Sequence, residues 1–393
     1  MGESGKPAVP WPDVMTARRF LGRLVDGDWG DGDRVLLQGI DQDALAGWLV
    51  RHGLAPFAYS QCRHVLTDLG DRLEPASLRV AACNTLRFHQ LSQVLKCFQD
   101  ASIPVVVLKG AALARGVYGD IVRRPMGDVD LWVRDTDMPR AADILRALGF
   151  RELIKDYRPL ALQALARGER QFRDTRGMVE LHWSPFPGWL MCWTAAVDEA
   201  GVWERAEPLD LEDGEIQREH RPNGGLVRLL SAEDMVIQLA AHLTVTHRVS
   251  EGVVRGLMDI ALTARARPVD WDVVVERATA WRLRTAVWAA LDLASQLVGL
   301  MGVEGALTDL RPPCHQRALL RALASPTSVL AERNLAKGWV RFLIWLVLVD
   351  RPRDAFRLAF RTLWPERAWM AARYGEGGNR WHHLWNVMRH GEV

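Results

Sequence analysis

The chain has 393 residues, of which 49% are hydrophobic and 25% are charged, close to the proportions of ordinary globular proteins. These values exclude a largely disordered chain, a collagen-like chain and a disulfide scaffold, and the length predicts two domains or one domain with large additions. Fifty basic residues against 48 acidic ones leave a net charge of +2, so charge gives no reason to expect nucleic acid or a membrane as a partner.

The cysteine pattern and the apolar segments favour a cytoplasmic protein. The five cysteines form no Cys-x-x-Cys pair, which argues against a zinc or redox motif and is typical of a reducing compartment. The first twenty residues lack the apolar core of a signal peptide. The longest apolar run, residues 340–349, is interrupted by Arg341 and is too short to span a bilayer, so it predicts a buried helix.

Residues 1–100 are expected to form an N-terminal helical segment. From about residue 15, apolar residues recur at three- and four-residue spacing, as they do over 44–49. Gly70 and Pro75 predict an interruption of this helical pattern, because both residues disfavour the interior of a helix.

Residues 101–200 are expected to form an α/β core with a small mixed sheet. Residues 103–108 are uniformly apolar and rich in β-branched side chains, which predicts a strand buried on both faces. The other expected elements follow in order: a helix after residue 110, a strand over 128–134, a helix over 137–148 capped by Asp137, and a hairpin of 171–175 and 178–184.

Residues 201–393 are expected to form a mostly helical C-terminal domain. The stretch Gly214-Glu215-Ile216 predicts a short edge strand. From Ser231, which begins a sequence similar to a capping box, the pattern is helical almost to the end of the chain, with prolines between the segments.

The strand over 128–134 carries the most informative motif of the chain. Because side chains alternate along a strand, Asp128 and Asp130 share one face while the apolar residues between them share the other. Two adjacent carboxylates repel each other unless they are exposed or bind a cation. Mg²⁺ prefers oxygen ligands and usually takes one or two carboxylates together with substrate phosphates. The motif is therefore typical of a phosphoryl- or nucleotidyl-transfer site.

The second strand of the hairpin supplies a third carboxylate. In the sequence from Val179 to Trp183, the apolar residues face the core, whereas Glu180 and His182 face the other way. If this strand neighbours the Asp128 strand, three carboxylates gather on one face. Such a set holds two metal ions, or one metal ion and a base that activates an acceptor hydroxyl.

Basic and glycine residues near the carboxylates are expected to hold phosphates. Lys109-Gly110 ends the first strand and opens a helix, where glycine lets a phosphate approach the backbone and the helix N-terminus favours an anion. Only five of the 50 basic residues are lysines, so a lysine at this turn is more informative than another arginine. Lys109 and Arg124 are predicted to neutralise a triphosphate.

Three segments together resemble the uncharacterised nucleotidyltransferase family of the DNA polymerase β-like superfamily. They are Leu108-Lys-Gly110, Arg124-Pro-Met-Gly-Asp-Val-Asp-Leu131 and Val179-Glu-Leu-His-Trp183. A looser resemblance runs from about residue 80 to 375 and includes His242 and the segment around Asp259. It implies an α+β fold: a polymerase β-like nucleotidyltransferase core with a small mixed sheet, N-terminal helices and a C-terminal helical domain.

The resemblance also implies an activity. It is metal-dependent transfer of a nucleoside monophosphate from an NTP to a hydroxyl or phosphate of an acceptor, with release of pyrophosphate. Carried over by position, the catalytic residues that bind Mg²⁺ or Mn²⁺ are Asp128, Asp130 and Glu180. The nucleotide-binding residues are Lys109, Gly110, Arg124 and Gly127. The residues placed to support the metal ligands or to contact the acceptor are His182, His242 and Asp259.

One position departs from the superfamily pattern. Many members have serine after the loop glycine, where the hydroxyl contacts phosphate, but this chain has Ala111. Either the phosphate contacts are rearranged or the donor is not an ordinary NTP. Members of the family often occur beside genes for ribosomally made peptides, including lasso peptides. The resemblance therefore indicates a peptide or small-molecule acceptor in natural-product biosynthesis, with neither nucleic acid nor a membrane as partner.

Each motif also has a purely structural interpretation. Asp-x-Asp often caps a turn, Glu180 and His182 would be ordinary strand residues in another register, and Lys109 would be a surface loop charge. His242 and His247 are five residues apart without an intervening glutamate, a spacing that argues against a zinc site.

Other functions stay open at this point. The chain would be a non-catalytic scaffold or peptide-binding protein if it kept the nucleotidyltransferase fold without its chemistry. A DxD glycosyltransferase would also bind a metal ion through the two aspartates. That fold normally has several strand–helix units before its motif, and only one precedes the motif here. A phosphatase of the DxDxT type fits poorly, because Trp132 occupies the threonine position.

Overall fold

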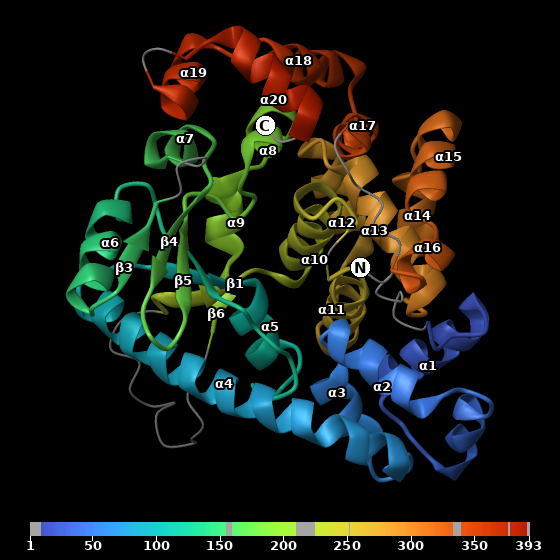
Figure 1. Ribbon diagram of the computed structural model, residues 1–393. Coiled ribbons are helices and arrows are strands. Elements are labelled where there is room, and N and C mark those ends of the chain that lie inside the picture. Colours follow the sequence, from blue (N-terminus) through green and yellow to red (C-terminus); the bar gives the residue numbers. More distant parts are fainter. Residues whose placement is uncertain are drawn as a thin grey trace, which may run out of the picture.

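The N-terminal part of the chain is helical, as its apolar spacing predicts. The computed structural model describes residues 9–154, 159–209, 225–250, 252–332, 339–375 and 378–390. The first helices are α1 (Val14–Asp26), the 3₁₀ helix η1 (Asp31–Leu37), α2 (Gln42–Arg51) and α3 (Ala55–Cys62). They lie together beside one end of the long helix α4 (Figure 1).

Helix α4 (Thr67–Asp100) runs for 34 residues without the predicted interruption. Pro75 lies inside it and removes one helical hydrogen bond. The apolar residues on either side, Leu69 and Leu73, are fully buried, and this packing offsets the local cost. Gly70 is a close-packing position, since a Cβ there would lie 3.0 Å from Cβ of Arg63. The expected break was therefore wrong, because tertiary burial outweighed local propensity.

A seven-stranded mixed sheet forms the centre of the α/β part, with the strand order β3-β4-β5-β2-β1-β7-β6. The strands are β1 (Val105–Leu108), β2 (Val129–Trp132), β3 (Arg151–Leu153), β4 (Glu169–Arg173), β5 (Met178–His182), β6 (Glu207–Pro208) and β7 (Val227–Leu229). The helices between them are α5 (Lys109–Gly116), α6 (Met138–Ala147), α7 (Leu160–Leu165), α8 (Trp189–Thr194) and α9 (Glu199–Arg205).

The expected first strand and the expected hairpin are present. All four residues of β1 are buried, because β1 lies between antiparallel β2 and parallel β7 and also contacts α5. β4 and β5 pair antiparallel as the hairpin. Two further strands, β6 and β7, come from beyond residue 200 and join the same sheet. The edge strand predicted at 214–216 lies outside the described residues.

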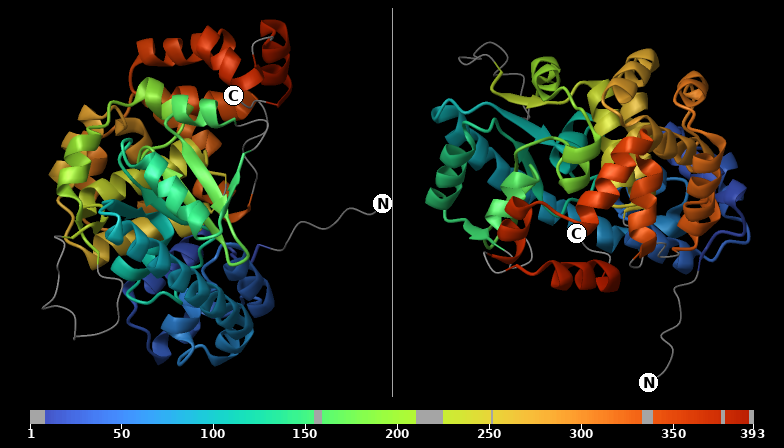
Figure 2. Two further views of the ribbon diagram at one scale, coloured as in Figure 1. Left: turned by 90° about the vertical axis from the view of Figure 1, so that its left-hand side faces the viewer. Right: turned by 90° about the horizontal axis from the view of Figure 1, so that it is seen from above.

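The rest of the chain is helical. The elements are α10 (Ala232–Ala241), the π-helical turn η3 (His242–Thr246), α11 (Val253–Ala266), α12 (Trp271–Ala280), α13 (Arg284–Leu297), α14 (Glu304–Asp309), α15 (Cys314–Leu323), α16 (Pro326–Leu330), α17 (Trp339–Leu348), α18 (Pro352–Leu363), α19 (Arg367–Tyr374) and α20 (Arg380–His390). α10 packs against α11, α12 and α13, and α1 packs against α11 and α13. Figure 2 shows α18 to α20 covering the end of the molecule opposite α4.

The apolar run at 340–349 forms most of α17 and contributes Ile344 and Leu348 to the core, as predicted. No described helix has both the length and the apolar character needed to cross a bilayer. The expected fold class is confirmed: a mixed sheet with helices before it and a large helical part after it.

Candidate active site

Two neighbouring strands carry the predicted carboxylates. β2 and β5 pair in parallel, and their register sets Asp130 beside Glu180 and Trp132 beside His182. The apolar residues between these positions point to the opposite face and are almost completely buried. Strand pairing therefore brings together two carboxylates that lie 50 positions apart in the sequence.

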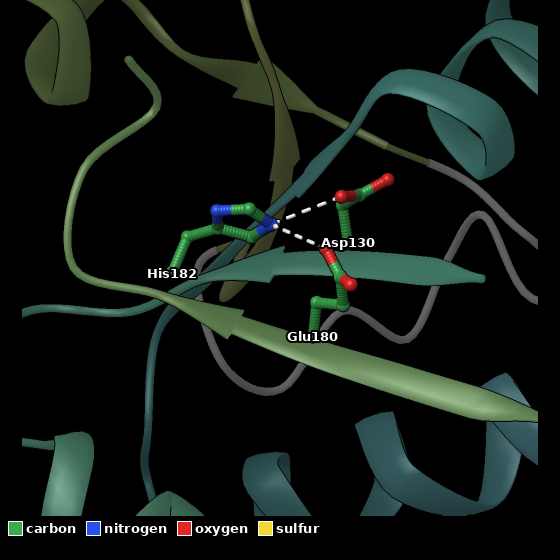
Figure 3. Close-up of side chains that lie close together, drawn as sticks. All are labelled: Asp130, Glu180 and His182. Atoms are coloured by element: carbon green, nitrogen blue, oxygen red, sulfur yellow. Dashed lines mark hydrogen bonds and ion pairs between the residues drawn. The ribbon is translucent and has the colours of Figure 1, made fainter. Parts of the chain in front are cut away.

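Asp130 belongs to a buried polar cluster with Glu180 and His182 (Figure 3). Its Oδ1 accepts a hydrogen bond from Nζ of Lys109 at 2.7 Å and lies 2.9 Å from Nε2 of His182. The same His182 nitrogen is 3.7 Å from Oε2 of Glu180, whose other oxygen accepts a 2.8 Å hydrogen bond from Gln171. Asp130, Glu180 and His182 are all less than 9% exposed.

The turn between β1 and α5 directs Lys109 into this cluster. Lys109 has a φ of 45°, in the left-handed region that non-glycine residues seldom adopt. Such conformations cluster at functional sites, where surrounding structure holds them in place. Here the ion pair with Asp130 and the first residues of α5 fix the conformation.

The charges of the cluster are unbalanced. Burial and the negative charge of Asp130 raise the pKa of Glu180 to about 8. Burial also opposes ionisation of Asp130, but the Lys109 ammonium and the His182 hydrogen bond hold its pKa well below the usual range. Burial and Asp130 together raise the pKa of Asp128. With Lys109 as the neighbouring cation, Asp130 ionises readily, whereas ionisation of Glu180 and Asp128 is disfavoured.

The donor set fits a divalent cation. One atom each from Asp130, Glu180 and His182 lie within 4.8 Å of one another. Two carboxylates suit Mg²⁺, and a carboxylate–imidazole combination also suits Mn²⁺. The raised pKa of Glu180 reflects an excess of negative charge in the buried cluster, and a bound divalent cation would neutralise it.

The remaining residues of the motif differ in their exposure. Asp128 lies just before β2 and is half-buried. Gly127 is exposed, and a Cβ there would meet no atom within 4 Å. Gly110 is buried, and a Cβ there would lie 3.0 Å from both Nη1 of Arg124 and Cγ of Met126. The backbone at Gly110 is therefore closely approached by protein atoms.

Arg124 and Asp259 are brought together in a second buried cluster. The Arg124 guanidinium donates two hydrogen bonds to the Asp259 carboxylate, both 2.8 Å long, and the Tyr118 hydroxyl donates a third at 2.8 Å. Asn84 on α4 donates to the backbone carbonyl of Arg124 at 2.8 Å. The loop before β2 is thus tied to α4 on one side and to α11 on the other. Sequence reasoning missed this pairing, although an aspartate within the apolar α11 sequence required a buried partner.

His242 lies near the carboxylate cluster without touching it. It begins the π-helical turn η3, a feature often found at functional sites, and its Nε2 is 2.9 Å from Nε2 of His247. Burial and the positive charge of Lys109 hold the pKa of His242 well below its ordinary value. His242 is therefore neutral at physiological pH.

The fold and the site together define a class of protein. A mixed sheet with carboxylates on adjacent strands, beside a strand–Lys-Gly–helix turn, is typical of nucleotidyltransferases.

Comparison with known proteins identifies the family. The sequence model of a family described as "Uncharacterised nucleotidyltransferase" matches residues 38–299, and the chain belongs to that family. A solved structure, the solution structure of the antibiotic-resistance factor ANT(2'')-Ia, is 16% identical and aligns with 53% of this chain and 96% of that chain, at a TM-score of 0.35. No curated protein matches the chain.

Proposed function

We propose that this protein transfers a nucleoside monophosphate from an NTP to a hydroxyl or phosphate of a small-molecule or peptide acceptor. The observation that carries this proposal is the pairing of β2 with β5, which sets Asp130 beside Glu180 within reach of Lys109. Membership of a nucleotidyltransferase family supports the reaction class. A peptide or small metabolite from natural-product biosynthesis is the acceptor that the family resemblance favours.

In this proposal Asp128, Asp130 and Glu180 hold Mg²⁺ or Mn²⁺, with His182 beside them. When bound, the metal ion neutralises charge on the donor phosphates and polarises the phosphoryl group that is transferred. Lys109 fixes Asp130 in one orientation through its 2.7 Å hydrogen bond. Gly127, where a Cβ would meet no atom within 4 Å, leaves room for the triphosphate, whereas Gly110 packs against Arg124 and Met126.

The covalent change is a substitution at the α-phosphorus of the donor. A bond forms from the acceptor oxygen to this phosphorus, the bond to the β-phosphate oxygen breaks, and pyrophosphate leaves. A hydroxyl acceptor also loses a proton, and Glu180 either completes the metal site or, as a free carboxylate beside it, takes this proton. Catalysis then depends mainly on positioning and charge neutralisation.

Arg124 takes a different role from the one its motif position indicates. Its guanidinium is already engaged by Asp259. We therefore propose that Arg124 positions the loop before β2 and does not itself contact the triphosphate. Asp259 acts through Arg124 in the same way, and His242 is a half-buried, neutral residue near the site.

The test is binding and turnover with each NTP, with and without Mg²⁺. Wild type is compared with Asp128→Asn, Asp130→Asn and the exposed control Asp143→Asn on α6. We expect metal-dependent binding in wild type and the control, and a fall in turnover of at least ~10²-fold in the other two variants. Full activity in both site variants, or no NTP binding by wild type, would contradict the proposal.

A further inference from the structure

Arg255 on α11 lies beside the loop that leads into the carboxylate site. A Cβ at Gly53 would lie 2.7 Å from Nη1 of Arg255 and 3.2 Å from Cγ of Pro125. The Arg255 guanidinium and Pro125 therefore share the space left by Gly53. Pro125 precedes Asp128 by three residues, so this guanidinium is close to the start of β2.

The charge of Arg255 has no direct counterion among the described residues. Nearby arginines are neutralised: Arg124 by Asp259 and Arg51 by Glu332. In the described part of the chain Arg255 forms no hydrogen bond or ion pair. Burial and the positive charge of Arg124 lower its pKa. No nitrogen of this half-buried guanidinium is among the described buried atoms that lack a partner, so it is accessible to solvent and to a bound anion.

Two carboxylates act on the charge of Arg255, first Asp259, which already pairs with Arg124, and then Asp128. The negative charge of Asp128 acts on Arg255, which places the two groups within electrostatic range, yet they form no ion pair within 4.0 Å. A ligand with a cation at one side and oxyanions at the other satisfies both residues at once. A metal-bound triphosphate has that distribution of charge, with its metal toward Asp128 and its phosphate oxygens toward Arg255.

We infer that Arg255 binds the phosphate chain of the nucleotide donor, so that the helical part of the protein contributes a cation to the nucleotide site. The inference rests on the proposed function and goes beyond its motif residues. A guanidinium suits this task because it stays charged at physiological pH and donates two parallel hydrogen bonds to phosphate oxygens. It also provides the phosphate contact that Arg124, engaged by Asp259, does not make.

The experiment uses two ligands, Mg²⁺–NTP and Mg²⁺–tripolyphosphate, the second of which lacks a base and a sugar. Calorimetry gives the Kd of each for wild type, Arg255→Ala, Arg255→Gln and Arg255→Lys. Arg265→Ala, on the same helix but in an exposed ion pair with Asp26, is the matched control. Circular dichroism and Tm establish that each variant is folded, and Arg255→Gln keeps the aliphatic stem if the alanine variant is unstable.

We expect Arg255→Ala and Arg255→Gln to weaken both ligands by about tenfold or more, Arg255→Lys to weaken them less, and the control to bind as wild type does. Wild-type affinity in folded Arg255→Gln would overturn this inference and leave the proposed function standing. Failure of wild type to bind any NTP would overturn the proposed function. In that case, weaker tripolyphosphate binding by the Arg255 variants than by wild type would still support an anion site at Arg255. Absence of tripolyphosphate binding by wild type would overturn that site as well.

Discussion

Arg124 and Asp259, which lie 135 positions apart in the sequence, form a buried ion pair held by two hydrogen bonds. One lies in the loop before the Asp128–Asp130 motif and the other in the middle of α11. The pair therefore joins the catalytic sheet to the helical part of the protein. Because the pair lies beside the Asp128–Asp130 motif, the geometry of these carboxylates depends on α11, a helix outside the motif.

Removing one partner of this pair is expected to destabilise the fold strongly. Asp259→Ala leaves the Arg124 guanidinium buried without a counterion, which costs about 3–5 kcal/mol in the free energy of unfolding. Urea denaturation measures the effect. The control is Asp292→Ala, which breaks a pair with the exposed Arg321 and should cost at most ~1 kcal/mol. Equal losses in the two variants would show that the buried pair has no special structural role.

The contribution of Glu180 to the stability of the metal-free protein is expected to fall as the pH rises. The pKa of Glu180 is raised by burial and by Asp130, from an ordinary value of 4.5 to about 8 in the folded state. The folded protein therefore binds one more proton than the unfolded chain between these values. The stability from this group is complete below pH 4.5 and is lost as the pH rises through about 8.

Glu180→Gln tests that dependence, because an amide does not titrate. Between pH 4.5 and about 8, calorimetric Tm values in EDTA should fall less, or rise more, for this variant than for wild type. Glu304→Gln, at an exposed position on α14, should keep the wild-type slope. A wild-type slope in Glu180→Gln would assign the pH dependence to other groups.

Alanine is expected to act differently at the two glycines of the site. Gly110→Ala places a Cβ 3.0 Å from Arg124 and Met126, so it should lower stability by about 1–3 kcal/mol through overpacking. Gly127→Ala meets no atom within 4 Å and should change stability by no more than about 0.5 kcal/mol, while weakening NTP binding. Thermal unfolding with nucleotide titration separates the two effects. The reverse pattern would mean that Gly110 is the phosphate-approach position.

Restoring the serine of the wider superfamily is expected not to improve nucleotide binding. Ala111 is 0% exposed, so a hydroxyl at this position lies in the core and has no open path to a phosphate. Ala111→Ser should leave the Kd for Mg²⁺–NTP unchanged and cost about 1–3 kcal/mol in stability if the hydroxyl finds no partner. Calorimetry and denaturation measure the two quantities. A clear gain in affinity would show that the turn rearranges to present the hydroxyl.

The candidate catalytic residues could be predicted from the sequence because the pattern that marks them involves only residues nearby in the chain. Alternation along a strand sets Asp130 apart from its apolar neighbours, and the same alternation singles out Glu180. The Lys109-Gly110 turn follows from a buried strand meeting the start of a helix. Each of these features depends on neighbours a few residues away, so sequence alone predicted the candidate site and its nucleotidyltransferase character.

The tertiary structure decided which of these residues meet and what their partners are. Only strand pairing sets Asp130 beside Glu180, and only helix packing pairs Arg124 with Asp259 while Arg255 has no ion pair among the described residues. Packing also carried α4 through Pro75 without the break that local propensity predicted. Burial and ion pairing depend on groups far apart in the chain, and their free energies are set by the dielectric and the partners at the folded position. No local pattern of residues encodes that information.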